Sequence, residues 1–149
     1  MKKYCFLIFF IFLQGDFVQA QTPYTWTFKA TKVADRTYDI HSIADVQAPW
    51  HTYSQFTPDG GPLPTKFSFS RNPLYTLDGI VKENGNLVIR HEEVFGVDVK
   101  YFEGKVDFVQ RVKIKGSAKT NFTGTVEFMV CNEQQCLPPA TQKFTVALN

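Results

Sequence analysis

The sequence contains few cysteines, no excess of either charge and no second long hydrophobic run. Only three of its 149 residues are cysteines, and its 16 basic residues nearly balance 14 acidic ones. This balance excludes the basic surface that nucleic acids require and also a charged interaction tail. No apolar segment follows the one at the N-terminus, so we expect no stable membrane insertion once that segment is removed.

The N-terminus has the pattern of a secretory signal peptide. Lys2 and Lys3 precede an apolar run, Tyr4 to Leu13, that is too short to span a bilayer as a helix. Val18 and Ala20 then supply small residues at the −3 and −1 positions of a cleavage site. We expect cleavage after Ala20; an uncleaved anchor helix is the alternative.

Removal of residues 1–20 would take Cys5 away and leave residues 21–149 as a single domain. About 129 residues are enough for one domain with its own hydrophobic core. Export places the protein in the periplasm or outside the cell. In such an oxidising compartment we expect the two remaining cysteines, Cys131 and Cys136, to be joined.

Alternation with period two runs through most of the remaining chain. It is clear in four segments, residues 24–29, 105–114, 126–130 and 144–148. Aromatic and β-branched residues alternating with polar ones are typical of half-buried antiparallel strands. No window shows helical spacing with caps. The sequence therefore predicts an all-β fold, an immunoglobulin-like antiparallel β-sandwich of roughly seven to nine short strands.

Turn residues lie between these segments. Asn84-Gly85 is the strongest signal, because both central residues of a type I′ hairpin turn take positive φ. Residues 34–36 and 59–62 mark further breaks, and residues 122–124 a weaker one.

Cys131 and Cys136 are separated by four polar residues and followed by Pro138-Pro139. If Val130 faces the core, alternation turns Cys131 outward at the end of its strand. A disulfide across so short a loop would contribute only about 2 kcal/mol of loop entropy. An exposed loop would, however, give a partner's thiolate access to a sulfur. The spacing, which is not C-x-x-C, leaves both a structural clasp and a redox-active pair open.

The stretch from Thr125 to Leu148 resembles the end of the N-terminal domain of DsbD, the thiol:disulfide interchange protein. The resemblance lies in the two cysteines, the Pro-Pro pair and the final strand. Upstream, residues 50–55 resemble an aromatic strand near the cysteines of that family, and residues 91–96 resemble its cap loop. Residues 60–65 are similar to a run in stand-alone relatives. The resemblance implies an immunoglobulin-like domain with a redox-active cysteine pair and no metal or cofactor.

The resemblance also implies roles for particular residues. Cys136 would form mixed disulfides with partners, and Cys131 would resolve them. Phe95 would cap the bond and keep stray thiols away, although a core aromatic is an equal alternative. The cysteines here are separated by one residue fewer than in the best-known members, which affects the loop geometry.

Four further residues would surround the cysteine pair. His51 and Tyr53 would line the site, and His51, which replaces a tyrosine of the family, could shuttle a proton near neutral pH. An exposed strand histidine and a packing tyrosine are the alternatives. Glu92 and Glu93 would flank the thiols and raise their pKa by like-charge repulsion; a solvated loop pair is the alternative.

The function implied is thiol:disulfide interchange, with possible protein-disulfide reductase activity. The domain would relay electrons between a thioredoxin-like or membrane reductase and oxidised envelope proteins. DsbD continues into a transmembrane domain and a thioredoxin-like domain, whereas this sequence ends at Asn149, so we expect a stand-alone domain with a separate electron donor. A non-catalytic binding sandwich with a clasp disulfide is one alternative.

The other alternative is a carrier of Cu(I). Met129, Cys131, Cys136 and His51 offer the thioether, thiolate and imidazole ligands that suit this ion. The chain contains neither a C-x-x-C motif nor a methionine-rich run in support.

Overall fold

The computed structural model describes residues 22–117 and 119–149, and the signal peptide expected at residues 1–20 lies outside this part. The described residues form eight strands and no helix. The strands are β1 (Tyr24–Ala34), β2 (Thr37–Tyr53), β3 (Lys66–Phe69), β4 (Tyr75–Glu92), β5 (Val97–Ile114), β6 (Thr120–Phe128), β7 (Val130–Cys131) and β8 (Ala140–Leu148). Within these residues, nothing helical is long and apolar enough to cross a membrane.

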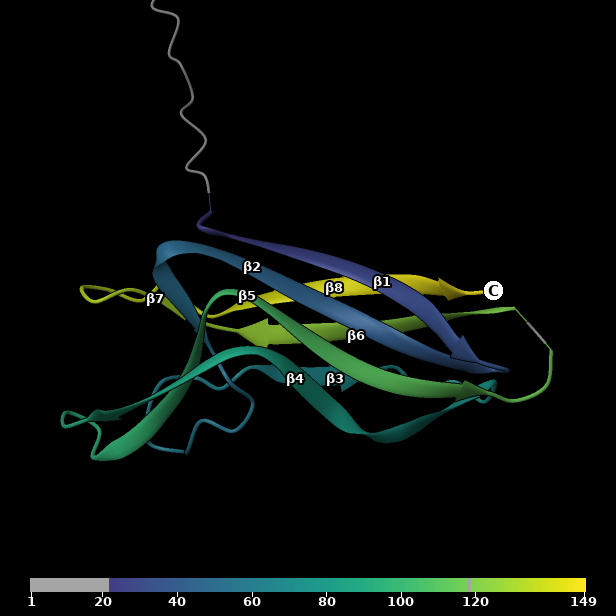
Figure 1. Ribbon diagram of the computed structural model, residues 1–149, viewed down its shortest axis with the longest axis horizontal. Helices are drawn as coiled ribbons and strands as arrows, with labels where there is room; N and C mark the ends of the chain where they lie inside the picture. Colours follow the sequence, from purple (N-terminus) through teal and green to yellow (C-terminus); the bar gives the residue numbers. More distant parts are fainter. Residues whose placement is uncertain (1–21, 118) are drawn as a thin grey trace, which may run out of the picture.

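Two antiparallel sheets make up the fold (Figure 1). One has the strand order β1-β2-β5-β4, with β7 paired to the end of β2, and the other has the order β3-β6-β8. The predicted all-β, immunoglobulin-like sandwich is confirmed. β2, β4 and β5 are longer than the short strands predicted, with 17, 18 and 18 residues.

The hydrophobic core lies between the sheets, as the alternation predicts. On β5, Val106, Phe108 and Val112 are buried, and so are the inward residues of β6 and β8. Phe108 lies 5.2 Å from Phe67 of the opposite sheet and 5.9 Å from Trp26, measured between ring centroids. Apolar burial of this kind is the main force that holds two sheets together.

Two of the predicted breaks are turns, and two are not. Residues 34–36 connect β1 to β2, with Arg36 at φ 51°, and residues 59–62 lie in the loop before β3. The prediction of a turn at Asn84-Gly85 is wrong, because both residues lie inside β4, opposite Asp107 and Val106 of β5. The break at residues 122–124 is also wrong, since they lie inside β6.

Gly85 serves close packing rather than a turn. A Cβ at this position would lie 3.0 Å from Phe102 Cδ1 and 3.1 Å from Val106 Cβ. We expect Gly85→Ala to lower the free energy of unfolding by about 1–3 kcal/mol through overpacking. Asn84→Ala, on the exposed neighbour, should change it by less than about 0.5 kcal/mol. Urea denaturation measures both, and equal losses would instead support a turn at these residues.

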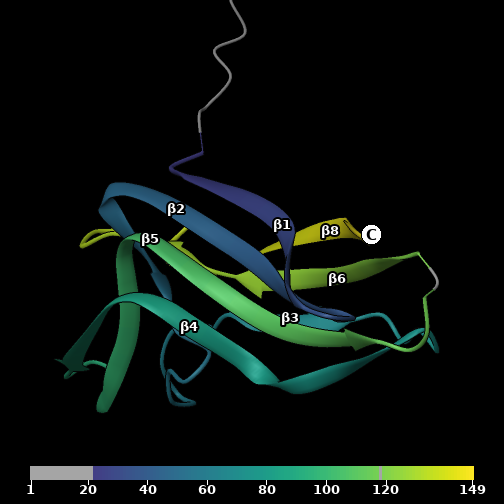
Figure 2. The ribbon, with the colours of Figure 1, turned by 45° about the vertical axis from the view of Figure 1, so that its right-hand side comes forward.

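Two strands change register against β5 at one level of the first sheet. β2 does so between Val46 and His51, opposite Gly104 of β5, and β4 does so between Gly85 and Leu87. Irregularities of this type bend a strand and increase its twist. Beyond this level the ends of β2 and β5 curve away from the sandwich (Figures 1 and 2).

Candidate functional site

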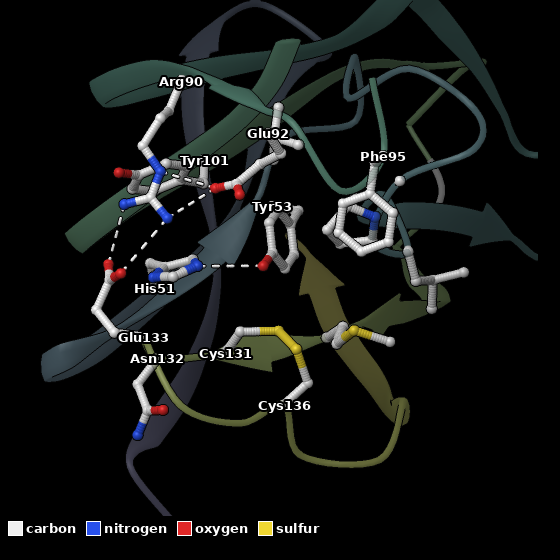
Figure 3. A pocket seen from close by; sticks show the side chains of 15 residues that line it. His51, Tyr53, Arg90, Glu92, Phe95, Tyr101, Cys131, Asn132, Glu133 and Cys136 are labelled. Carbon is white, nitrogen blue, oxygen red and sulfur yellow. Dashed lines mark hydrogen bonds and ion pairs between the residues drawn. A yellow bond between two sulfur atoms is a disulfide. The ribbon is translucent and has the colours of Figure 1, made fainter. Parts of the chain in front are cut away.

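A cavity of about 430 Å³ lies beyond the bend, between the end of β2, the β4–β5 hairpin and the loop after β7. Figure 3 shows the side chains that line it. Six of the seven site residues expected from the sequence are among them: His51, Tyr53, Glu92, Phe95, Cys131 and Cys136. The structure thus brings together residues that lie up to 85 positions apart in the chain.

Cys131 and Cys136 are joined by a disulfide, with their Cα atoms 4.0 Å apart. Cys131 is only 2% exposed and packs with Tyr53, Val99 and Tyr101, whereas Cys136 is exposed. The prediction that Cys131 faces outward is wrong. The strand is interrupted at Met129, and the residues after it pair with β2 of the other sheet, so the alternation of β6 does not continue.

The loop between the cysteines is closed by its own hydrogen bonds. Asn132 Oδ1 accepts the backbone N–H groups of Gln134 and Gln135, both at 2.9 Å. The Asn132 N–H donates to the Gln135 carbonyl, and that of Leu137 donates to the Val130 carbonyl, again at 2.9 Å. An asparagine that bonds the backbone two residues on is typical of a tight turn. These bonds hold Cys136 directly beside Cys131.

His51 and Tyr53 lie next to Cys131. His51 pairs with Cys131 across β2 and β7, and its Nε2 lies 3.1 Å from the Tyr53 hydroxyl. The alternative of an exposed strand histidine is wrong, since His51 is 8% exposed. Burial lowers the pKa of His51 below its ordinary value of 6.5 and raises the pKa of Tyr53 to about 12. Both groups are therefore uncharged at neutral pH.

Arg90 and Glu133 belong to the site, although neither was expected from the sequence. Arg90 Nε donates to Glu92 Oε1 at 2.7 Å, and Arg90 Nη1 donates to Glu133 Oε1 at 3.1 Å (Figure 3). The hydrogen bond to Glu133 is the main cause that raises the pKa of Arg90, and in return it lowers the pKa of Glu133. The two-residue spacing on a strand could have placed Arg90 beside Glu92. No sequence signal places Glu133.

Arg90 changes the electrostatic role expected for the glutamates. A bare carboxylate would raise the pKa of a nearby thiol, but Glu92 is paired with the guanidinium. Glu93 does not line the cavity; its side chain is exposed on the turn after β4. Alternation turns it away from Glu92, so of the two glutamates only Glu92 lines the cavity with the cysteines.

Phe95 lies on the turn that joins β4 to β5. Its N–H donates to the Glu92 carbonyl at 3.0 Å, and its ring lines the cavity together with Cys136 (Figure 3). The side chain is 48% exposed, so it is not a core aromatic. It stands on a short turn at the cavity wall, where movement of the hairpin would displace it.

The four candidate ligands for Cu(I), Met129, Cys131, Cys136 and His51, line this same cavity. Two of them are joined in the disulfide, which offers no thiolate to a metal. Across residues 22–117 and 119–149, no group of three or more His, Cys, Asp or Glu side chains is arranged to hold a metal ion.

Comparison with known proteins places this geometry in context. The family model described as "Thiol:disulfide interchange protein DsbD, N-terminal" matches residues 18–148. The reduced N-terminal domain of DsbD from Neisseria meningitidis has a similar structure, with a TM-score of 0.53 and 15% identity over 83% of this chain and 86% of that one. No curated protein sequence is significantly similar to this chain.

Two further solved structures share the fold. One is the complex between the DsbD N-terminal and PilB N-terminal domains of Neisseria meningitidis, with a TM-score of 0.51 and 13% identity over 87% of each chain. The other is the N-terminal periplasmic domain of ScsB from Proteus mirabilis, with a TM-score of 0.51 and 12% identity over 84% of this chain. This chain spans 44% of the length of that ScsB chain.

Proposed function

The chain belongs to the family of DsbD N-terminal domains, and from this we propose that it is a periplasmic thiol:disulfide interchange module. Residues 21–149 would form its single domain after cleavage of the signal peptide behind Ala20. The Cys131–Cys136 pair would relay electrons from a thioredoxin-like or membrane reductase to oxidised envelope proteins. The similar complex of a DsbD N-terminal domain with a PilB domain supports a protein partner.

The unequal exposure of the two cysteines is the observation that carries this proposal. Cys136 is open to solvent, whereas Cys131 is buried behind it. A donor thiolate must attack along the S–S axis, and Cys136 is the exposed end of the bond. Attack forms a mixed disulfide at Cys136 and releases Cys131 as the leaving thiolate. This is the division of roles that the resemblance implies.

The electrons balance over two steps. A second donor thiolate breaks the mixed disulfide, so the donor leaves oxidised and Cys131 and Cys136 remain as a dithiol carrying two electrons. The Cys136 thiolate then attacks a client disulfide, and Cys131 attacks Cys136 to release the reduced client and restore the bond. Both half-reactions use the same sulfur, so donor and client compete for one surface.

We assign His51 and Tyr53 to the Cys131 side of this reaction. A thiolate that forms in a buried place is unfavourable unless a hydrogen bond or a proton reaches it. His51 faces Cys131 across the strands, and Tyr53 packs against it. Both are uncharged at neutral pH, so either can donate a hydrogen bond from an N–H or O–H group without bringing charge into the pocket.

The reduction potential of the disulfide tests the proposal. An exchange pair is expected to equilibrate with a thiol buffer at a potential above about −300 mV, whereas a structural disulfide lies below this value. Titration of the purified protein against dithiothreitol of graded oxidation, with alkylation and mass spectrometry, gives the potential. A value well below −300 mV would favour the alternative of a binding sandwich with a clasp disulfide.

Phe95→Ala is expected to speed reduction of the disulfide by small thiols, because the ring on the cavity wall no longer covers the approach to Cys136. We expect an acceleration of roughly threefold to tenfold, equivalent to about 0.7–1.4 kcal/mol of lost shielding. Stopped-flow reduction by dithiothreitol measures it. Phe56→Ala is the matched control, since Phe56 is similarly exposed but does not line the cavity. Equal rates in the two variants would remove the cap role from Phe95.

A further inference from the structure

In the part of the chain that the structure describes, one side chain of the loop between the cysteines forms hydrogen bonds outside the loop. The hydrogen bonds of Asn132 stay within the loop. Glu133 alone reaches outside it, accepting from Arg90 Nη1 at 3.1 Å and from Nη2 at 3.5 Å. A tie of this kind restrains a loop whose other polar residues face solvent.

The same arginine is tied to the turn that carries Phe95. Arg90 Nε lies 2.7 Å from Glu92 Oε1. The Glu92 carbonyl, in turn, accepts the N–H groups of Phe95 at 3.0 Å and Gly96 at 2.8 Å, which closes that turn. A continuous set of contacts therefore runs from Phe95 through Glu92, Arg90 and Glu133 to the cysteine loop. Figure 3 shows the two interactions of Arg90 in this set.

Arg90 is also the cation that balances the carboxylates around the site. Glu92 of β4, Glu103 of β5 and Glu133 of the loop all act on buried His51, and Arg90 opposes them. His51 is uncharged at neutral pH and supplies no second cation. Loss of Arg90 would thus both release the loop and leave two carboxylates unpaired.

We propose that Arg90 is a positioning residue: its ion pairs with Glu92 and Glu133, here called the latch, join the cysteine loop to the Phe95 turn and slow attack on the disulfide until a partner releases them. The inference rests on the proposed exchange function and assigns to Arg90 and Glu133 a role in holding the Phe95 turn and the cysteine loop in place. A docking partner that offers a carboxylate to Arg90, or a cation to Glu133, replaces the ion pair as it opens the site. Exposed ion pairs are weak, so the latch opens readily.

The test must separate release of the latch from the change in charge. A neutral water-soluble phosphine meets this need, because its attack on the disulfide is not repelled by unpaired glutamates. Oxidised Arg90→Glu and Glu133→Arg are expected to be reduced roughly two- to fivefold faster than the parent protein, the range that a weak surface pair allows. The double variant R90E/E133R keeps the net charge and restores an arginine between two glutamates, so its rate should return to the parent value.

Salt and a distant ion pair provide the controls. In about 1 M salt, where charges are screened beyond about 3 Å, the parent rate should rise toward that of the single variants. Arg111 makes a comparable pair with Asp39, at 2.7 and 2.8 Å and away from the cavity, so Arg111→Glu should leave the rate unchanged. The melting temperature of each variant shows whether it is folded, and the double variant keeps the test decisive if a single variant is destabilised.

Equal phosphine rates in the parent and both single variants would overturn the latch, and so would a double variant that stays fast. Exchange of the parent protein with a reduced thioredoxin-like protein is followed in parallel. Failure of that exchange would overturn the proposed function, whereas the phosphine rates decide the latch alone.

Discussion

Cys131→Ala is expected to convert the protein into a trap for its partners. The variant retains the exposed Cys136 thiol, which attacks a partner's disulfide and forms a mixed disulfide. The cysteine that would resolve this bond is gone, so release is left to the partner's own thiol and the adduct accumulates. Non-reducing electrophoresis of the variant from its native host should show disulfide-linked adducts with thioredoxin-like envelope proteins. A reducing agent should cleave these adducts.

Cys136→Ala is the matched control for the trap. It leaves Cys131, which is 2% exposed and packed against Tyr53, Val99 and Tyr101. A partner's sulfur cannot reach this thiol in the folded protein, so adducts should be at least tenfold fewer, a difference of about 1.4 kcal/mol in the barrier. Adducts at equal levels in the two variants, or none that depend on Cys136, would contradict the assignment of Cys136 as the attacking sulfur.

Phe108→Ala is expected to cause the largest loss of stability, about 3–5 kcal/mol. Phe108 is 1% exposed and lies between the sheets, in contact with Trp26, Phe67 and Phe102. Removing the ring loses apolar burial and leaves a cavity that the rigid strands cannot close. Small domains have only about 5–15 kcal/mol of stability in total, so the variant should unfold at a markedly lower urea concentration.

Ile80→Ala gives the comparison for this loss. Ile80 is 71% exposed on β4, and its truncation should change the free energy of unfolding by less than about 0.5 kcal/mol. Urea unfolding followed by tryptophan fluorescence measures both variants, since Trp26 and Trp50 are partly buried and pack against the core. A loss below about 1 kcal/mol for Phe108→Ala would show that the two sheets are not held together at this point.

The sandwich could be predicted because its strands carry a strong local signal. Val106, Phe108 and Val112 alternate with polar residues along β5, and burial follows that alternation in the structure. The prediction of a turn failed at Gly85, because a glycine can serve either a turn or close packing. Gly85 follows an asparagine, as in a hairpin turn, but it is required by the close approach of Phe102 and Val106. Sequence alone does not distinguish a positive φ from a lack of space.

The site could be predicted only in part, for a different reason. The cysteines, Phe95 and Glu92 lie in short segments with a recognisable pattern, and the structure brings them to one cavity. The burial of Cys131 was missed because alternation carries over only while a strand continues, and here the chain changes sheets after Met129. The Arg90–Glu133 pair joins residues 43 positions apart and depends on tertiary structure alone.

The shared bend in β2, β4 and β5 has a consequence for how such domains can diversify. The aromatic core lies on one side of the bend, and the segments that would meet other proteins lie on the other. Substitutions in these segments can therefore alter the recognition of partners while the core keeps its contribution to the free energy of unfolding. A protein engineer could exchange these segments together between homologous frameworks, by cutting β2, β4 and β5 at this level and the chain on either side of the cysteine loop, between β6 and β8.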